Sequence, residues 1–209
     1  IKFTGIVPGN LKIALAFGNE LILLMLGGFL ISAAMERSGA HHRIALGMIR
    51  LIGGDSSRRI VFGFIIASAM LSMWISNTAT ALMMLPIALA VIHQSPDKKL
   101  AIPLLLSIAY GSSIGGLGTP IGTPPNLVFM QQYEKFTDHS VSFVQWMSWG
   151  LPVVFVFIPI TALWLTRHLD YHGKLTMPPV GNWRSEERRV LIIFGLTAIA
   201  WMTRLEPFG

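Results

Sequence analysis

Two uncharged stretches of the sequence hold residues that could bind a small cation and an anion together. The first contains Ser72 and the triplet Ser76-Asn77-Thr78, and the second is the glycine- and proline-rich run 115–126. Hydroxyl, carboxamide and backbone carbonyl oxygens are ligands for hard cations, and O–H and N–H groups donate hydrogen bonds to anions. Because Asn77 has both an acceptor and donors, its side chain can face a cation and an anion at once.

Neither stretch contains Lys, Arg, His, Asp or Glu. A bound anion would therefore depend on neutral donors, on the positive ends of helices and on co-bound cations. If a cation supplies the missing positive charge, the affinity for the anion depends on that cation, and coupling follows from thermodynamic linkage.

The first stretch lies within a segment, residues 60–96, that contains no Lys, Arg, Asp or Glu. Its two apolar arms, residues 60–75 and 79–93, hold about 16 and 15 residues, or ~24 and ~22 Å as helix, whereas a hydrocarbon core of roughly 30 Å requires about 20 residues. Arg58-Arg59 precede the segment and Lys98-Lys99 follow it, and short basic loops favour the cytoplasmic side. The sequence therefore predicts a re-entrant helical hairpin with Ser76-Asn77-Thr78 at its tip.

A second uncharged segment, residues 100–133, begins as a helix and is then interrupted. The run 115–126 has four glycines and three prolines in twelve residues, a composition that cannot continue a helix. We expect a discontinuous transmembrane helix whose second half starts close to Asn126. Two irregular segments in neighbouring elements match the plan of a secondary transporter site, in which unwound carbonyls face a cation and half-helix N-termini face an anion.

The remaining sequence predicts further membrane elements. Residues 1–59 contain an apolar span followed by a short basic helix, whose apolar face and separate arginines are typical of a helix in the membrane interface. Residues 143–166 form another predicted span, residues 167–189 a basic cytoplasmic connection, and residues 190–209 begin with a last apolar run. The alternation of basic and slightly acidic loops fits a hairpin followed by two full crossings.

The composition places the chain among multi-span, all-α membrane proteins. Hydrophobic residues make up 53% of the 209 residues and charged residues only 12%. The net charge of +6 would suggest nucleic acid in a soluble protein, but here the basic residues lie in short loops, where membrane topology explains them. The absence of cysteine excludes disulfides and thiolate metal sites. No acid, base or nucleophile pair lies near the middle of the predicted membrane segments, so we expect no enzyme.

The two motifs, Ser76-Asn77-Thr78 and the run 118–126, resemble those of the divalent anion:sodium symporter family, which contains sodium-coupled dicarboxylate and citrate transporters. The resemblance covers nearly the whole chain. It implies an inverted-repeat transporter of the elevator type, usually a homodimer, in which residues 60–96 and 100–133 belong to the mobile transport domain and residues 1–59 to the scaffold side. By this comparison the chain is roughly the N-terminal repeat, and residues 190–209 start a second repeat whose remainder is missing from this sequence.

The resemblance also implies specific ligands. Na⁺ would be the coupling ion, bound by Ser72, Ser76, Asn77 and the backbone at Gly122. Half of the carboxylate site would come from Asn77, Thr78, Thr123 and Pro124. The function implied is sodium-coupled symport of di- or tricarboxylates similar to succinate, malate or citrate, across a cell membrane such as the bacterial inner membrane.

Two other functions are compatible with the same residues. The fold could exchange dicarboxylates or another divalent anion without sodium, in which case sodium would not change ligand affinity. From a different class, a passive ion pore also uses broken helices. Saturable flux at low turnover separates a carrier from a pore, which would show unitary currents.

Overall fold

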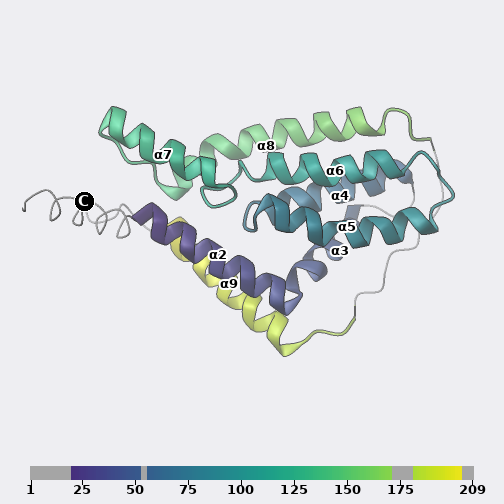
Figure 1. Cartoon of the computed structure of the whole chain (residues 1–209), viewed down its shortest axis with the longest axis horizontal. Helices are drawn as coiled ribbons and strands as arrows, with labels where there is room; N and C mark the ends of the chain where they lie inside the picture. The colour runs from purple at the N-terminus through teal and green to yellow at the C-terminus, as the bar shows by residue number, and fades with distance from the viewer. Residues whose placement is uncertain (1–19, 53–55, 171–180, 204–209) are drawn as a thin grey trace, which may run out of the picture.

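The computed structural model describes residues 20–52, 56–170 and 181–203, and every element in this part of the chain is an α-helix (Figure 1). The all-α prediction is therefore confirmed for these residues. Of the predicted regions, the pieces 1–19, 53–55, 171–180 and 204–209 lie outside the described residues. The helices are α2 (Glu20–Ser38), α3 (Ala40–Ile52), α4 (Ser57–Ser72), α5 (Asn77–Gln94), α6 (Ala101–Gly115), α7 (Pro124–Thr137), α8 (Phe143–Thr166) and α9 (Ser185–Thr203).

Helix α4 lies at the centre of the described fold. Most of its residues are buried, and the large side chains of Ile60, Phe64 and Ile65 are 0% exposed. Helices α3, α5, α6 and α8 all contact it. A helix with apolar or small residues on every side is expected to be enclosed in this way. Helix α4 is therefore the element against which its neighbours are positioned.

Small residues let α4 and α6 approach each other closely. A Cβ atom at Gly111 would lie 2.6 Å from the carbonyl oxygen of Ile65, and one at Gly115 would lie 2.2 Å from that of Ala69. Membrane helices commonly associate through small residues, because lipid supplies no hydrophobic drive between them. Since Gly115 ends α6 and Ala69 lies in the last turn of α4, the contact brings the C-terminal ends of both helices together.

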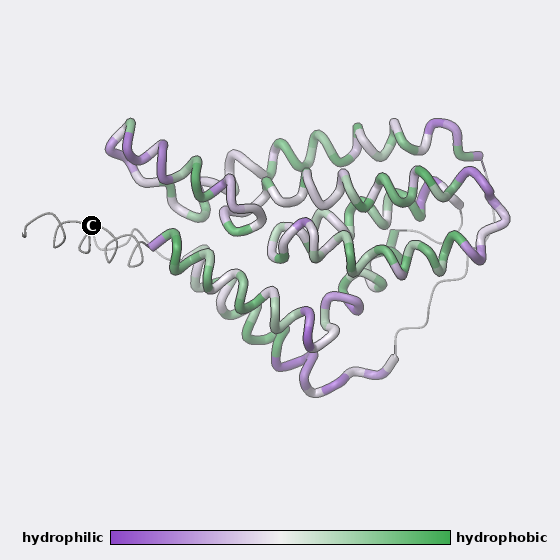
Figure 2. The backbone as a smooth tube through the Cα atoms, in the orientation of Figure 1, coloured by the Kyte–Doolittle hydropathy of each residue, from purple (hydrophilic) through white to green (hydrophobic). Residues whose placement is uncertain are grey.

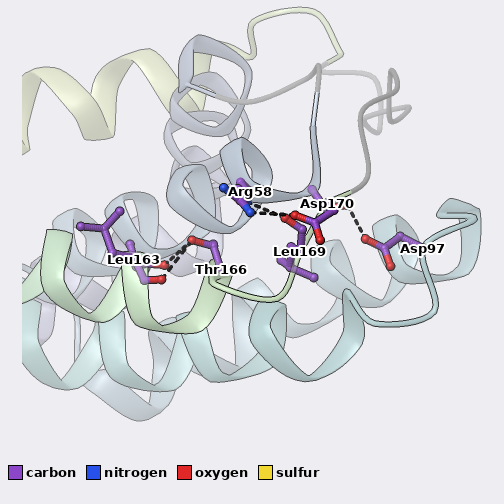
Figure 3. A network of polar contacts seen from close by, with 8 residues as sticks. Arg58, Asp97, Leu163, Thr166, Leu169 and Asp170 are labelled. Carbon is purple, nitrogen blue, oxygen red and sulfur yellow. Dashed lines mark hydrogen bonds and ion pairs between the residues drawn. The ribbon is translucent and has the colours of Figure 1, made fainter.

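Helices α4 and α5 form a hairpin whose outer ends are tied together. The Ser57 hydroxyl, in the first turn of α4, donates to Asp97 Oδ2 beyond the end of α5 at 2.7 Å. Arg58 donates to the carbonyl oxygen of Leu169 and forms a 2.8 Å ion pair with Asp170 after α8 (Figure 3). The start of α4 and the ends of α5 and α8 thus share one end of the bundle, where Figure 2 shows that hydrophilic residues gather.

Helices α2 and α9 lie side by side, at an angle to the bundle around α4 (Figure 1). Helices α2, α5 and α8 are long and apolar enough to cross a membrane. Within the chain, only 22% of the most apolar 18-residue stretch of α2 is buried, and the same share of that of α8. For α5 the share is 28%. Large apolar side chains such as Leu30 and Phe155 are therefore exposed, as lipid-facing residues are. These helices are those of a membrane protein, as the composition predicts.

Helix α3 corresponds to the predicted short basic helix. Its apolar residues Ala45, Leu46 and Ile49 are buried, mainly against α4, where a Cβ atom at Gly63 would lie 3.1 Å from the Cα atom of Ile49. The opposite side of the helix carries Arg43, which reaches the start of α9. Helix α3 therefore connects the bundle around α4 with the α2–α9 pair.

The contact between α3 and α9 is an ion pair with little exposure to water. Arg43 lies 2.9 Å from Glu187, and the two side chains are 14% and 9% exposed. Arg43 also donates to the carbonyl oxygen of Asn182 at 2.8 Å and lies 4.3 Å from the centre of the Trp183 ring. The backbone N–H of Arg184 and then the Arg43 guanidinium hold the pKa of Glu187 below its usual value, although partial burial opposes the shift.

We expect Gly115→Ala to lower the apparent melting temperature in detergent. An alanine in a helix normally gains up to about 1 kcal/mol over glycine, but a methyl group 2.2 Å from the Ala69 carbonyl oxygen forces α4 and α6 apart, at about 1–3 kcal/mol or more. Gly47→Ala in α3, whose Cβ atom would meet nothing within 4 Å, is the matched control and should be neutral or stabilising. Equal melting temperatures for the two variants would contradict the close α4–α6 contact.

We expect Arg43→Gln and Glu187→Gln each to lower the melting temperature, and the double variant to lose less than the sum, because the pair contributes only when both charges are present. Since the folded-state pKa of Glu187 is lowered, its contribution is present above the ordinary carboxyl pKa of about 4.3 and is lost as pH falls through the folded value. Arg189→Gln, which removes an exposed charge from the same turn of α9, is the control. Strictly additive losses would show that the pair contributes nothing.

Candidate functional site

The tip of the α4–α5 hairpin is a short turn closed by a helix cap. Helix α4 ends at Ser72, and α5 begins at Asn77 with Ser76 as its N-cap. The Ser76 hydroxyl accepts from the backbone N–H of Ala79 at 3.2 Å, and its carbonyl oxygen accepts from the N–H of Thr80 at 2.9 Å. Serine is preferred at this position because its hydroxyl satisfies one of the N–H groups that begin a helix without a partner.

A side-chain hydrogen bond spans the tip. Ser72 Oγ donates to Asn77 Oδ1 at 2.6 Å, and Ser72 is 0% exposed. Two oxygen atoms that the sequence predicts as cation ligands are therefore in contact. Among the described residues, none accepts a hydrogen bond from the carboxamide nitrogen of Asn77, which could therefore donate to an anion.

The break between α6 and α7 is organised by Asn126, in the first turn of α7. Its Nδ2 donates to the carbonyl oxygen of Gly116 at 2.8 Å and to that of Thr119 at 2.9 Å. Pro124 and Pro125 begin α7, where proline is favoured because the first N–H groups of a helix have no partner within it. Helices α6 and α7 are thus separate, and the break between them runs from the residue after Gly115 to Thr123.

The tip and the break meet at Gly116. A Cβ atom at Gly116 would lie 2.6 Å from Asn77 Oδ1, and a Cβ atom at Gly122 would lie 2.5 Å from the Gly116 carbonyl oxygen. The Thr119 hydroxyl donates to the carbonyl oxygen of Met73 in the tip. The structure therefore brings together the two stretches that the sequence predicts as one site, with Asn77 on one side of Gly116 and Gly122 on the other.

Burial divides the predicted site residues into an inner and an outer group. Ser72 and Gly122 are buried, and Ser76, Asn77 and Thr123 are half-buried. Thr78 and Pro124 are exposed. The residues that the resemblance assigns to sodium are therefore buried or half-buried, and those it assigns to a carboxylate are half-buried or exposed. Asn77 is half-buried and belongs to both groups.

The two helix N-termini at the site differ in what they offer an anion. Helix α7 begins with two prolines, which have no backbone N–H. Thr123, its N-cap residue, makes no side-chain hydrogen bond to the helix, so its hydroxyl is not used for capping. Helix α5 begins with Asn77 and Thr78, whose backbone N–H groups lie at the positive end of the helix dipole. Helix α5 therefore presents more backbone N–H groups at its first turn than α7 does.

The electrostatics of the site follow from its neutral side chains. The tip and the break carry no ionisable side chain, and no group of three or more His, Cys, Asp or Glu that could hold a metal occurs in the described part of the chain. A cation bound here would be held by hydroxyl, carboxamide and carbonyl oxygens alone. That chemistry suits a weakly held alkali cation that must be released, rather than a resident transition metal.

Two residues at the break have roles that the sequence alone does not predict. Trp146 of α8 is half-buried and donates from Nε1 to the carbonyl oxygen of Leu117 at 3.0 Å. A Cβ atom at Gly150 would lie 2.3 Å from the same oxygen, so α8 packs directly on the break. The sequence predicts for Asn126 only that the second half-helix starts close to it. Its position directly after Thr123-Pro124-Pro125, in the first turn of that helix, is the signal that could have indicated a role at the break.

Comparison with known proteins identifies the family. A family model described as citrate transporter matches residues 3–208. The sodium-dependent dicarboxylate transporters SdcS of Staphylococcus aureus strains NCTC 8325 / PS 47 and COL are each 38% identical over 216 aligned residues, which cover 92% of this chain and 41% of each relative.

The chain thus spans about two fifths of the length of the relatives it matches. These relatives are named as transporters and not as enzymes, in agreement with the expectation from the sequence. The match extends through both motifs and supports the resemblance to the divalent anion:sodium symporters. The chain therefore belongs to the citrate transporter family.

Proposed function

We propose that this chain forms half of the cargo site of a secondary transporter that takes up di- or tricarboxylates together with sodium. The observation that carries the proposal is the contact of Ser72, Asn77 and Gly116, where a helical hairpin tip meets a broken helix at a site without ionisable side chains. The names of the relatives, citrate transporter and sodium-dependent dicarboxylate transporter, support the same function.

The neutral site explains why a cation would be needed. A dicarboxylate brings two negative charges into a region of low dielectric, where an uncompensated charge is costly. The tip and the break supply hydroxyl, amide and N–H donors but no positive side chain. Sodium bound next to the carboxylate would supply the opposing charge, so each ligand would raise the affinity for the other by the same factor. Cation binding is therefore coupled to anion binding.

The burial of each residue indicates which of the two ligands it would bind. Sodium would be bound by Ser72, Ser76, Asn77 and the backbone at Gly122, of which Ser72 and Gly122 are buried. The carboxylate would be bound further out, by the Asn77 carboxamide together with Thr78, Thr123 and Pro124. Because Thr78 and Pro124 are exposed within this chain, the other half of the carboxylate site would come from a second repeat of the same protein.

The membrane topology follows from the charges at one end of the bundle. The hairpin would be re-entrant, since Ser57 and Asp97 tie its two ends together and basic residues flank both, at Arg58-Arg59 and Lys98-Lys99. Helix α5 has 18 residues and is long and apolar enough to cross a membrane, but a crossing by α5 alone would place one of these two tied ends on each side. The basic end would be cytoplasmic, in a multi-pass protein of the bacterial inner membrane.

An elevator mechanism would divide the chain into two bodies. Residues 60–96 and 100–133 would form the mobile transport domain, and residues 1–59 would belong to the scaffold side, with residues 190–209 starting the second repeat. Helices α2 and α9 pack against each other (Figure 1), and they also contact the break and the tip. A Cβ atom at Gly28 of α2 would lie 3.3 Å from Ile121, and the rings of Trp74 and Phe194 of α9 are 5.0 Å apart, so the two bodies would meet at these contacts. Helix α3 would connect the two bodies, and the scaffold would pair in a homodimer.

Sodium dependence of binding and uptake tests the function. In a full-length carrier that contains this chain, reconstituted in liposomes, we expect succinate affinity to rise with sodium and saturable uptake to require a sodium gradient. Potassium or choline in place of sodium is the control. A succinate affinity that is independent of sodium would support the exchanger, and unitary currents would support the pore. Either result contradicts the proposal.

Asn77→Ala should weaken both sodium and succinate binding, each by at least about tenfold, or about 1.4 kcal/mol, because one carboxamide faces both ligands. The measurement is a pair of titrations on the purified full-length carrier, sodium at fixed succinate and succinate at fixed sodium. Ser113→Ala, an exposed position on α6, is the control and should change neither. Unchanged sodium affinity in the Asn77 variant would refute the bridging role.

A further inference from the structure

We infer that Asn126 is a positioning residue that sets the affinity for sodium without touching sodium or the carboxylate. The inference rests on the proposed function, because it requires that sodium binds where the hairpin tip meets the break. Asn126 is 3% exposed, and both hydrogen-bond donors of its carboxamide are committed to backbone carbonyl oxygens of the break. Its side chain therefore lies behind the site.

The two carbonyl groups that Asn126 holds belong to the residues that shape the site. Gly116 lies against Asn77 Oδ1, where even a Cβ atom would come within 2.6 Å. Thr119 is tied to the hairpin tip, because its hydroxyl donates to the Met73 carbonyl oxygen. By holding both carbonyl oxygens, Asn126 determines the distance of the break from the tip.

A continuous chain of hydrogen bonds links Asn126 to the predicted sodium ligand Gly122. Asn126 Nδ2 donates to the Thr119 carbonyl oxygen at 2.9 Å, and the backbone N–H of Gly122 donates to the same oxygen at 3.3 Å. The orientation of the Gly122 peptide therefore depends on Thr119, which depends on Asn126. Removing the carboxamide would release both peptides.

Asn126 also decides which carbonyl oxygens remain for a cation. Those of Gly115, Gly116, Leu117 and Thr119 accept from N–H donors within the described residues. In the same part of the chain, no hydrogen-bond donor reaches the carbonyl oxygen of Gly122, nor those of Gly118, Pro120 and Ile121. Without Asn126, the Gly116 oxygen would lose its only donor in the described residues and would compete with that of Gly122 for the cation.

The main test is Asn126→Ala in the full-length carrier, with succinate uptake measured over a range of sodium concentrations. We expect the sodium concentration for half-maximal uptake to rise by about 10- to 100-fold, as when an outer partner of a metal ligand is removed. At saturating sodium, the maximal rate and the succinate affinity should stay near those of the parent. A residue that faced the carboxylate, as we propose for Asn77, would instead lose succinate affinity at saturating sodium as well.

Asn126→Asp supplies a readout that a merely structural role would not move. The aspartate has the same shape, but its ionised form is only an acceptor, whereas the protonated form has one O–H donor. Contact with two carbonyl oxygens, which only accept, favours the protonated form, whose O–H can donate to one of them. We expect the sodium affinity of this variant, divided by that of the parent at each pH, to recover partly as pH falls. Asn126→Ala should show no recovery.

Trp146→Phe is the matched control at the break. It removes the donor to the Leu117 carbonyl oxygen but keeps an aromatic ring on α8, and Leu117 is not part of the chain of hydrogen bonds to Gly122. Its sodium affinity should stay close to that of the parent. If Asn126→Ala does not give a monodisperse protein, Asn126→Ser, which keeps one donor on a shorter side chain, takes its place with a smaller expected loss.

The outcomes separate the inference from the function on which it rests. A sodium-dependent parent with unchanged sodium affinity in the folded Asn126 variants overturns the inference alone. An equal loss of sodium and succinate affinity also overturns it, because Asn126 would then contact both ligands. So does an equal loss of sodium affinity in Trp146→Phe, because any loosening of the break would then be enough to weaken sodium binding. A parent that does not respond to sodium overturns the proposed function, and the inference with it.

Discussion

The site depends on one constraint, namely that backbone polar groups freed inside a membrane protein must find partners within the protein. Two helices are interrupted here, and each interruption frees N–H and C=O groups where little water is present to satisfy them. Side chains supply part of the missing partners, namely the Ser76 and Thr119 hydroxyls, the Asn126 carboxamide and the Trp146 ring N–H. The groups that are left over, on Asn77 and around Gly122, are those that a ligand could satisfy. In the proposed function, the same set of backbone donors and acceptors would therefore serve both folding and ligand binding.

The close approach of the helix backbones brings the unpaired groups of the tip and of the break together. The glycines of α6 allow its end to lie directly on the end of α4, since a Cβ atom at Gly115 would overlap the Ala69 peptide. Gly150 allows α8 to lie on the Leu117 carbonyl oxygen in the same way. Larger side chains would separate these backbones and let the tip and the break find different partners. Glycines thus contribute to the site because they have no side chain to separate the backbone groups that meet there.

Much of the fold and of the candidate site could be predicted from the sequence because their signals are local. An uncharged run with a cap triplet in its middle predicts a hairpin, and glycine with proline in a second run predicts a break. The predicted arms, 60–75 and 79–93, differ by a few residues from α4 and α5. The role of Trp146 was not predictable in this way, because it depends on where α8 packs, and an interfacial tryptophan has the same sequence signature.

By itself, the sequence determined the class of the chain, the two interruptions and the chemical types of group they contain, because apolar run length, charge placement and the conformational limits of glycine and proline act on neighbouring residues. Only the tertiary structure decided that Asn77 meets Gly116, that Asn126 holds the Gly116 and Thr119 carbonyl oxygens, and that Arg43 of α3 pairs with Glu187 of α9. These contacts join residues from different helices. Their partners are chosen by how closely the helices pack, and no local pattern records that choice.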